Sequence, residues 1–317
     1  MGIAEYFASL NFMTLLKVVP GNVAQGLVWG ILALGVFITY KILDFADLTV
    51  DGSFATGGAV TVMLILAGVP APLALLAAVL AGCLAGLVTG LLHTALGIPG
   101  ILASILTQIA LFSVNLNIMG KANQAVSVDK YALVLSSRSN STAILIGLVF
   151  VAVIIGLLYW YFGTEQGCAI RATGCTPSMA KAQGININSM KLLALSLSNG
   201  LVALSGGLTA QYQGFSDINM GRGAIVIGLA AVIIGDVLHS AIMRKKQNFG
   251  VRLTFVVLGS IIYYLVIGIV LWLKMPTNDM KLFTAIIVAI FLAVPYLKER
   301  SRSSFARAAK NGGGHNA

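Results

Sequence analysis

Charged residues are scarce in this chain, and over long stretches they are missing. Only 9% of its 317 residues are charged and 58% are hydrophobic, whereas soluble domains average about 25% charged and about 45–50% apolar. Residues 52–120 contain no Asp, Glu, Lys or Arg, and about 20 apolar residues suffice for one helical crossing of a bilayer. Shorter uncharged runs cover residues 18–40, 139–164, 192–216, 253–273 and 282–297. The sequence therefore predicts a multi-pass membrane protein.

Polar stretches long enough for a separate soluble domain are also missing, since the longest are residues 121–140, 165–191 and 298–317. Backbone amides find no water in the bilayer core, so spans must be helices or a closed barrel. Barrel strands alternate polar and apolar residues, whereas these runs are solidly apolar. We expect an all-α, polytopic transmembrane helical bundle with about 8–10 membrane segments. Residues 1–297 form a single membrane domain in this interpretation, and residues 298–317 form a basic tail.

The residues needed for several kinds of chemistry are also lacking. Three cysteines give no disulfide framework, and no set of ligands with metal-site spacing accompanies them. A phosphate-binding loop, Gly-x4-Gly-Lys-Ser/Thr, is not found, because Gly120-Lys121 is followed by Ala122 and lacks the upstream glycine. Paired catalytic carboxylates or a Ser/His/Asp set are not apparent. We therefore expect no enzyme, no metal and no cofactor on this chain, and any ATP chemistry would belong to a partner.

The net charge of +10 is concentrated beside the apolar runs. Cytoplasmic loops of membrane proteins carry an excess of Lys and Arg, which explains this charge without nucleic acid as a partner. The loop over residues 165–191 and the C-terminal tail are therefore predicted to be cytoplasmic, and the tail to contact anionic lipid. The basic residues in question are Arg171, Lys181, Lys191, Arg244, Lys245, Lys246, Lys298, Arg300, Arg302, Arg307 and Lys310.

The first seventy residues allow two topologies. If Lys17 is cytoplasmic, residues 18–40 run outward and residues 44–69 must return to the outside, as a broken or re-entrant helix. If Lys17 is outside, residues 44–69 are an ordinary span. The cluster of Asp44, Asp47, Asp51 and Gly52 beside an apolar helix favours the broken helix.

Polar residues within predicted spans are candidates for a solute pathway, because ionisable groups in a bilayer are costly. The segment 45–50 (FADLTV) is echoed by 215–220 (FSDINM), and transporter repeats often place broken helices near a substrate. Interhelical hydrogen bonds and capping of helix N-termini are the structural alternatives. The candidate pathway residues are Asp47, Asp51, Ser113, Asn115, Asn117, Asn199, Asp217 and Asn219.

Gly82, Gly86 and Gly90 recur at intervals of four residues. This spacing puts three glycines on one helical face, where a neighbouring backbone can approach closely. We expect a helix-packing surface, either lining a pathway or serving packing alone.

The loop over residues 165–191 contains signals for a short helix. Thr176 is a good N-cap, Pro177 suits the first helical position and Gly184 is a natural stop. A helix of about two turns is unstable alone in water, so it must pack on its own bundle or on a second protein.

The loop also carries a family resemblance. Gly167-x3-Arg171-Ala172, followed by Ala180 and Gly184-Ile185, resembles the coupling segment of ATP-binding-cassette (ABC) importer permeases. The match is best with the branched-chain amino acid and ribose permease superfamily. Within it, residues 47–54 (DLTVDGSF) together with Gly120-x2-Asn123 resemble the single-permease systems of the tryptophan/tyrosine type.

This resemblance implies a permease subunit in a bacterial plasma membrane. A solute-binding protein outside the cell would deliver a small polar solute, such as an amino acid, and a separate ATPase subunit would hydrolyse ATP-Mg. A second copy of the chain would complete a homodimer. The coupling residues that it implies are Arg171, Pro177, Met179, Ala180, Lys181 and Gly184.

Two other functions remain open on the sequence. An ion-gradient-driven secondary transporter would use Asp47, Asp51 or Asp217 and would need no ATPase. A membrane scaffold or insertase-like protein would tolerate loss of the polar residues in its spans.

Overall fold

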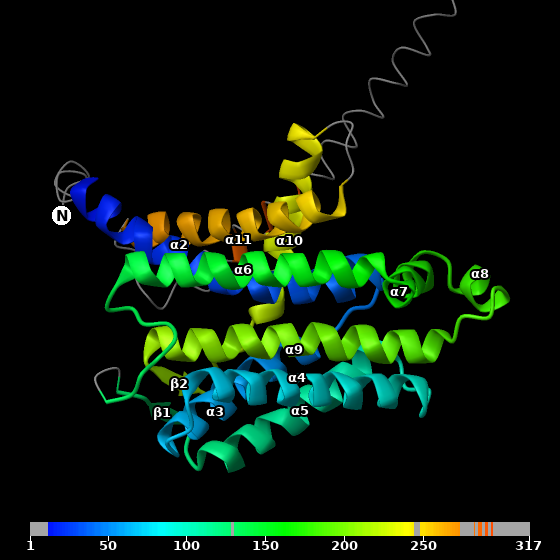
Figure 1. Cartoon of the computed structure of the whole chain (residues 1–317), viewed down its shortest axis with the longest axis horizontal. Coiled ribbons are helices and arrows are strands. Elements are labelled where there is room, and N and C mark those ends of the chain that lie inside the picture. Colours follow the sequence, from blue (N-terminus) through cyan, green and yellow to red (C-terminus); the bar gives the residue numbers. More distant parts are fainter. Residues whose placement is uncertain are drawn as a thin grey trace, which may run out of the picture.

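The computed structural model describes residues 12–127, 130–243 and 248–272, with isolated positions between 282 and 293. Eight of its helices are long and apolar enough to cross a membrane, which confirms the all-α polytopic bundle (Figure 1). The predicted span over 282–297 falls largely outside this part of the chain, and so do the Arg244–Lys246 cluster and the basic tail. The elements are α2 (Phe12–Phe37), a π-helix η1 (Ile38–Ile42), α3 (Thr49–Leu66), α4 (Ala71–Thr94), α5 (Gly100–Met119), β1 (Asn123–Ala125), α6 (Asn140–Gly163), α7 (Glu165–Cys175), α8 (Pro177–Ala182), α9 (Ile187–Gln213), β2 (Phe215–Asp217), α10 (Ala224–Ile242) and α11 (Phe249–Trp272).

Local sequence sets the ends of the long helices. Pro70 and Pro99 directly precede α4 and α5, where a missing N–H is tolerated. Gly120 and Gly214 end α5 and α9 with φ of 68° and 77°, a left-handed conformation that glycine adopts without a Cβ penalty. The uncharged runs over residues 139–164 and 253–273 correspond closely to α6 (Asn140–Gly163) and α11 (Phe249–Trp272).

Apolar side chains cover the outside of the bundle, and polar side chains lie within it. Leu80, Leu145 and Trp160 are 65%, 65% and 69% exposed, whereas Asn199 and Ser205 are fully buried. A soluble protein would lose free energy by leaving such large apolar side chains in water. Their exposure fits a lipid environment around the helices.

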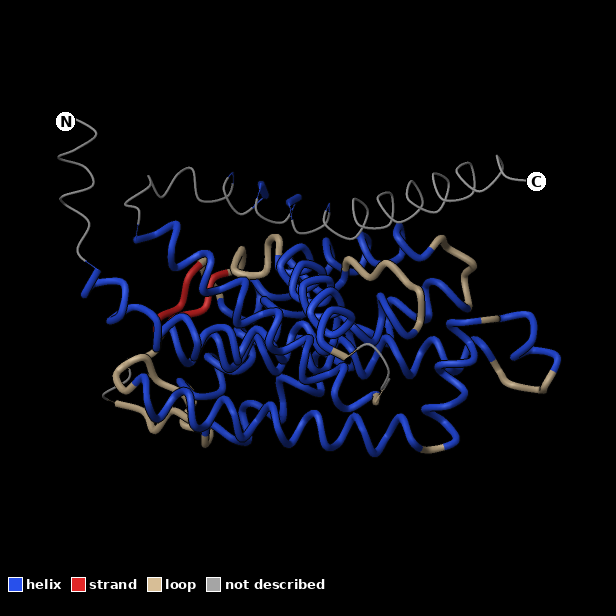
Figure 2. Tube along the Cα trace, turned by 90° about the horizontal axis from the view of Figure 1, so that it is seen from above, coloured by secondary structure: helices blue, strands red, loops and turns tan. Residues whose placement is uncertain are grey.

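The chain reverses direction between α2 and α3. α9 begins just after α8, and its Ser198 and Ser205 donate to the carbonyls of Gly35 and Val28 of α2, so these helices are antiparallel. α2 therefore ends near α8. Figures 1 and 2 place β1, β2 and the start of α2 at the opposite end. We call these two ends of the bundle the α8 end and the strand end.

α3 runs back toward the strand end as one continuous helix. Ser53 bonds to Asn199, and Thr61 lies beside Gly207, so α3 is parallel to α9. Its 18 residues span about 27 Å at about 1.5 Å per residue. The broken or re-entrant helix expected over residues 44–69 is therefore corrected to an ordinary span, the alternative that the sequence left open. Asp44 and Asp47, which suggested a broken helix, lie in the turn from Leu43 to Leu48, between η1 and α3.

Close helix contacts depend on glycines at the crossing points. A Cβ at Gly82 or Gly86 of α4 would overlap the carbonyl oxygens of Asn199 or Leu195 of α9. A Cβ at Gly90 would lie 2.7 Å from the Leu192 side chain. The predicted glycine face of α4 is thus where α9 packs, in the manner of small-residue interfaces in membranes.

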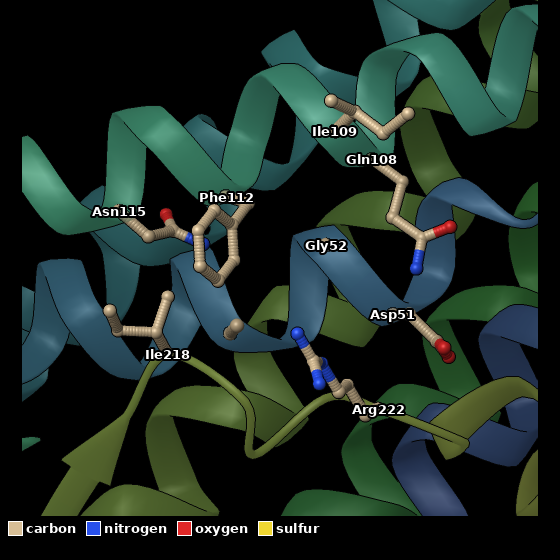
Figure 3. Close-up of a pocket in the computed structure, with 9 residues that line it drawn as sticks. Asp51, Gly52, Gln108, Ile109, Phe112, Asn115, Ile218 and Arg222 are labelled. Carbon is tan, nitrogen blue, oxygen red and sulfur yellow. The ribbon is translucent and has the colours of Figure 1, made fainter. Parts of the chain in front are cut away.

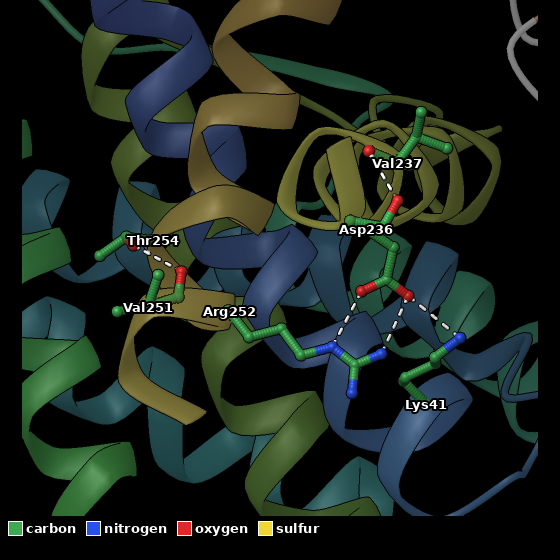
Figure 4. Close-up of polar contacts among 7 residues, drawn as sticks. Lys41, Asp236, Val237, Val251, Arg252 and Thr254 are labelled. Atoms are coloured by element: carbon green, nitrogen blue, oxygen red, sulfur yellow. Dashed lines mark hydrogen bonds and ion pairs between the residues drawn. The ribbon is translucent and has the colours of Figure 1, made fainter. Parts of the chain in front are cut away.

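A charged cluster joins three helices at the α8 end (Figure 4). Asp236 of α10 accepts two hydrogen bonds from Arg252 of α11, at 2.9 and 3.1 Å, and pairs with Lys41 of η1 at 3.0 Å. Arg252 also lies over the Phe37 ring, 5.4 Å from its centroid. Because each charge has a partner, the cluster can stay at a helix end with its side chains half-buried.

Candidate functional site: an inner cavity and an exposed short helix

Asp47 anchors the start of α3 to α9. One carboxylate oxygen accepts the Thr49 amide at 2.9 Å, and the other accepts the Asn199 side-chain amide at 2.7 Å. Asn199 Oδ1 in turn accepts the Ser53 hydroxyl at 2.7 Å. Burial raises the pKa of the Asp47 carboxyl, which lies in the connection between two spans, and the hydrogen bonds from Thr49 and Asn199 oppose that rise.

Asp51 caps a helix that is distant in sequence. Its two carboxylate oxygens accept the backbone amides of Gly223 and Ile225 at 3.0 and 2.9 Å. These amides open α10, whose N-cap Gly223 has no side chain to satisfy them. A negative charge at a helix N-terminus is favourable, so α3 stabilises the beginning of α10.

Asp217 repeats the local geometry of Asp47. It accepts the Asn219 amide at 2.7 Å, two residues ahead, as Asp47 accepts the Thr49 amide. It also faces the Asn123 side chain across the β1–β2 ladder, at 3.5 Å. The echo between 45–50 and 215–220 is therefore a shared turn, and Asp217 and Asn219 lie at the strand end of the bundle.

A cavity of about 300 Å³ lies between α3, α5 and the segment that links β2 to α10 (Figure 3). Two predicted pathway residues, Asp51 and Asn115, line it. Asn115 is 1% exposed, and neither its Oδ1 nor its Nδ2 has a hydrogen-bond partner among the described residues. The lining residues are Asp51, Gly52, Ala55, Gln108, Ile109, Phe112, Asn115, Ile218 and Arg222.

The cavity follows from spacing along α5 and from a glycine on α3. Gln108, Phe112 and Asn115 lie at i, i+4 and i+7, on one helical face. A Cβ at Gly52 would lie 2.9 Å from Leu111, so the glycine lets α3 approach α5 beside the cavity. Ser113 and Asn117 of α5 are exposed on the outer surface of the bundle and do not line the cavity.

Arg222 is a cavity residue that the sequence reasoning missed. It is exposed, and no hydrogen bond or ion pair of its guanidinium is found within the described part of the chain. A signal was available, because Arg222 is the one Lys or Arg between Lys191 and Arg244. An isolated charge at the start of an apolar span is a functional candidate by default.

The predicted short helix is present as α8 and is exposed at one end of the molecule (Figure 1). Pro177 occupies its first turn, and Thr176 is its N-cap residue but makes no side-chain capping bond. The Gly184 and Ile185 amides bond to the carbonyls of Lys181 and Ala180 at 3.0 and 3.1 Å. This is the hydrogen-bond pattern of a Schellman motif, with Gly184 at φ 82°.

One face of α8 is buried and the other is open. Ala180 is 4% exposed, whereas Met179 is 63% exposed and Lys181 and Pro177 are also exposed. An exposed methionine on a short helix that ends in a Schellman motif is suited to docking in an apolar cleft of another protein.

Residues that precede α8 form a helix, α7, where a loop was expected. Its low-propensity glycines are tolerated because the Thr164 side chain accepts the Gly167 amide and Glu165 lies in the first turn. Arg171 of α7 donates to the Phe162 carbonyl and lies 5.6 Å from the centroid of the Phe249 ring. These contacts connect α7 to α6 and α11 through Arg171.

A second brace lies at the same end. His93 of α4 bonds to the Ile98 carbonyl at 2.8 Å and to the Lys191 ammonium at 3.0 Å. It thereby ties the α4–α5 turn to the start of α9, which directly follows α8. Sequence reasoning gave neither residue this role, because nothing local predicts a contact between positions so far apart.

The described residues hold no group of three or more His, Cys, Asp or Glu that could bind a metal ion. Eight apolar helices that enclose polar side chains, with a short helix exposed at one end, are typical of a multi-pass membrane protein and are compatible with a transport subunit. The chain belongs to the family described as "Branched-chain amino acid transport system / permease component", whose sequence profile matches residues 21–295. It is thus a permease component of an ABC transport system.

One relative of named function is also a transport permease. A tyrosine transport system permease protein of Clostridioides difficile (strain R20291) is 42% identical over 269 residues, or 85% of this chain and 88% of that protein. An uncharacterised protein of Rickettsia prowazekii (strain Madrid E) is 33% identical over 181 residues, or 56% of this chain and 62% of that protein. Among solved structures, PsaBC from Streptococcus pneumoniae in complex with Fab matches with 15% identity, a TM-score of 0.40, and coverage of 84% of this chain and 95% of that one.

Proposed function

We propose that this chain is the permease subunit of a bacterial ABC importer for an aromatic amino acid of the tyrosine type. The substrate class is drawn from the relative that is named a tyrosine transport permease. An ATPase subunit would dock at the α8 end, which is then cytoplasmic, and a solute-binding protein would dock at the strand end. The C-terminal tail would lie on the cytoplasmic side and contact anionic lipid.

The observation that carries this proposal is the exposure of α8. A helix of six residues does not hold together alone in water, yet this one is closed by a Schellman motif and leaves Met179 63% exposed. Burying a methionine side chain contributes about 1.5–3 kcal/mol. A partner protein that takes up this side chain would gain that free energy.

A homodimer is supported by the outer face of α5. Ser113 and Asn117 are both exposed there, one turn apart, and polar side chains facing lipid are unfavourable. A second copy packed on this face would cover them and would place the two α3–α5 cavities near a shared axis.

The ion-gradient alternative relied on three aspartates. Asp47, Asp51 and Asp217 each accept backbone amide hydrogen bonds, which supports structural roles for them. The ABC proposal is therefore the stronger one.

Co-purification tests the proposal. The permease, tagged in its native membrane and extracted in mild detergent, should bring with it a stoichiometric ATP-binding subunit. Met179→Asp should abolish this co-purification, because a carboxylate would enter an apolar cleft. Phe215→Asp is the control, since Phe215 is an exposed apolar residue (38%) of β2 at the strand end, away from α8. A permease that purifies without an ATPase, or an M179D variant that retains it, would contradict the proposal.

A further inference from the structure

The cavity between α3 and α5 combines features that a structural role leaves unexplained. Asn115 is buried, and neither polar atom of its side chain has a hydrogen-bond partner among the described residues, although burying an amide without partners is unfavourable. Such a group calls for a ligand or bound water in the space that it faces. At about 300 Å³, the space is at the lower end of the range for small-molecule sites.

The charges around the cavity fit a zwitterion. Arg222 has no acidic partner among the described residues, and its planar guanidinium suits a carboxylate. Each Asp51 oxygen already accepts one α10 amide, but an ionised carboxylate offers about four acceptor positions in all. Asp51, Gln108 and Asn115 can therefore provide acceptors for an ammonium group.

The rest of the lining is apolar. Phe112, Ile109 and Ile218 form this part of the wall (Figure 3). An aromatic ring against Phe112 would gain a favourable ring–ring contact in addition to the burial of its area. The lining thus combines one group of each charge with an apolar wall.

We infer that this cavity is a binding site in the permease for a free amino acid with an apolar or aromatic side chain. Arg222 binds the α-carboxylate, the oxygens of Asp51, Asn115 and Gln108 accept from the ammonium, and Phe112 packs on the side chain. The choice of amino acid rests on the proposed function, whereas the carboxylate and ammonium contacts follow from the cavity.

Binding to the full-length permease in lipid nanodiscs tests the inference. Tritiated L-tyrosine should bind saturably, and unlabelled tyramine, which lacks the carboxylate, should compete poorly. Arg222→Gln should weaken tyrosine binding by about tenfold to a hundredfold, the value of a hydrogen-bonded charge. It should leave the affinity for tyramine unchanged, so that the discrimination between the two compounds is lost. Arg222→Lys should restore part of it.

Lys121→Gln is the matched control. Lys121 is an exposed cation just after α5, outside the cavity lining, and its removal should change neither affinity. Absence of saturable tyrosine binding to the wild type, or equal loss of tyrosine and tyramine binding in R222Q, would overturn the inference. A permease that still co-purifies with an ATPase in that case would leave the proposed function standing. A permease that binds tyrosine but has no ATPase partner would contradict the proposed function alone.

Discussion

Replacing Asn199 with alanine should destabilise the bundle more than most single substitutions do. The Asn199 amide donates to the Asp47 carboxylate at 2.7 Å, and its oxygen accepts from Ser53 at 2.7 Å. All three side chains are buried. A hydrogen bond to a charged group contributes about 1.5–3 kcal/mol, and an unsatisfied buried hydroxyl costs about 1–3 kcal/mol. We expect N199A to lower the free energy of unfolding by about 3–5 kcal/mol.

The assay is equilibrium unfolding of the purified permease in mixed micelles, followed by tryptophan fluorescence. Ser196→Ala on the same helix is the control, because Ser196 makes one neutral hydrogen bond, to the Cys83 carbonyl at 3.1 Å. It should cost about 0.5–1.5 kcal/mol. A double-mutant cycle of Asp47→Ala with N199A should give a coupling energy of about 1.5–3 kcal/mol. Additive effects, or an N199A cost no larger than that of S196A, would refute the proposed network.

Three further substitutions test other contacts. Gly86→Leu should lower the free energy of unfolding by about 1–3 kcal/mol or more, because its Cβ would overlap the Leu195 carbonyl. Gly156→Leu should be tolerated, because no atom lies near its Cβ. Equal melting temperatures of the two variants would contradict this contrast. Asp51→Ala should lower the free energy of unfolding by about 1–2 kcal/mol, because the Asp51 carboxylate accepts two amides at the start of α10. It should also speed amide hydrogen exchange in the first turn of α10. Unchanged exchange would argue against the cap. Asp236→Asn should cost about 1 kcal/mol at low salt, because the partly exposed Lys41 and Arg252 lose a charged partner that is 21% exposed. The difference from wild type should shrink at high salt.

The uncharged apolar runs of the sequence located the long helices well but did not show which elements pack against each of them. The bounds of α5, and the position of α8 between Thr176 and Gly184, follow from capping residues that act within a turn. These signals are local, so they can be read without knowing the fold. For α7 the same local reasoning failed, because its glycines obscured a helix that Thr164 caps and neighbouring helices support.

The polar residues of α5 show which features of the site the sequence alone cannot predict. Ser113, Asn115 and Asn117 are similar in chemistry and close in sequence, yet Asn115 is buried at the cavity and the other two are exposed. Which face of a helix meets α3 depends on the packing of the whole bundle. Arg222 reaches the cavity from a segment more than a hundred positions away, and no local pattern predicts that meeting.

The two halves of the echo differ in what their aspartates can do for transport. Asp47 and Asp217 accept an amide two residues ahead in the same way, so each fixes a turn and neither lines the cavity. Asp51 lies four residues after Asp47, and the matching position four residues after Asp217 is Gly221. A Cβ at Gly221 would overlap the Asp51 carbonyl oxygen, so the two segments meet at these positions. The absence of a side chain at 221 lets Asp51 reach the start of α10 and leaves Arg222 beside the cavity. Any movement of α10 relative to α3 would therefore change the cavity and the Asp51 cap together. Because α10 ends at the α8 end, such a movement would connect the proposed solute site to that end of the bundle.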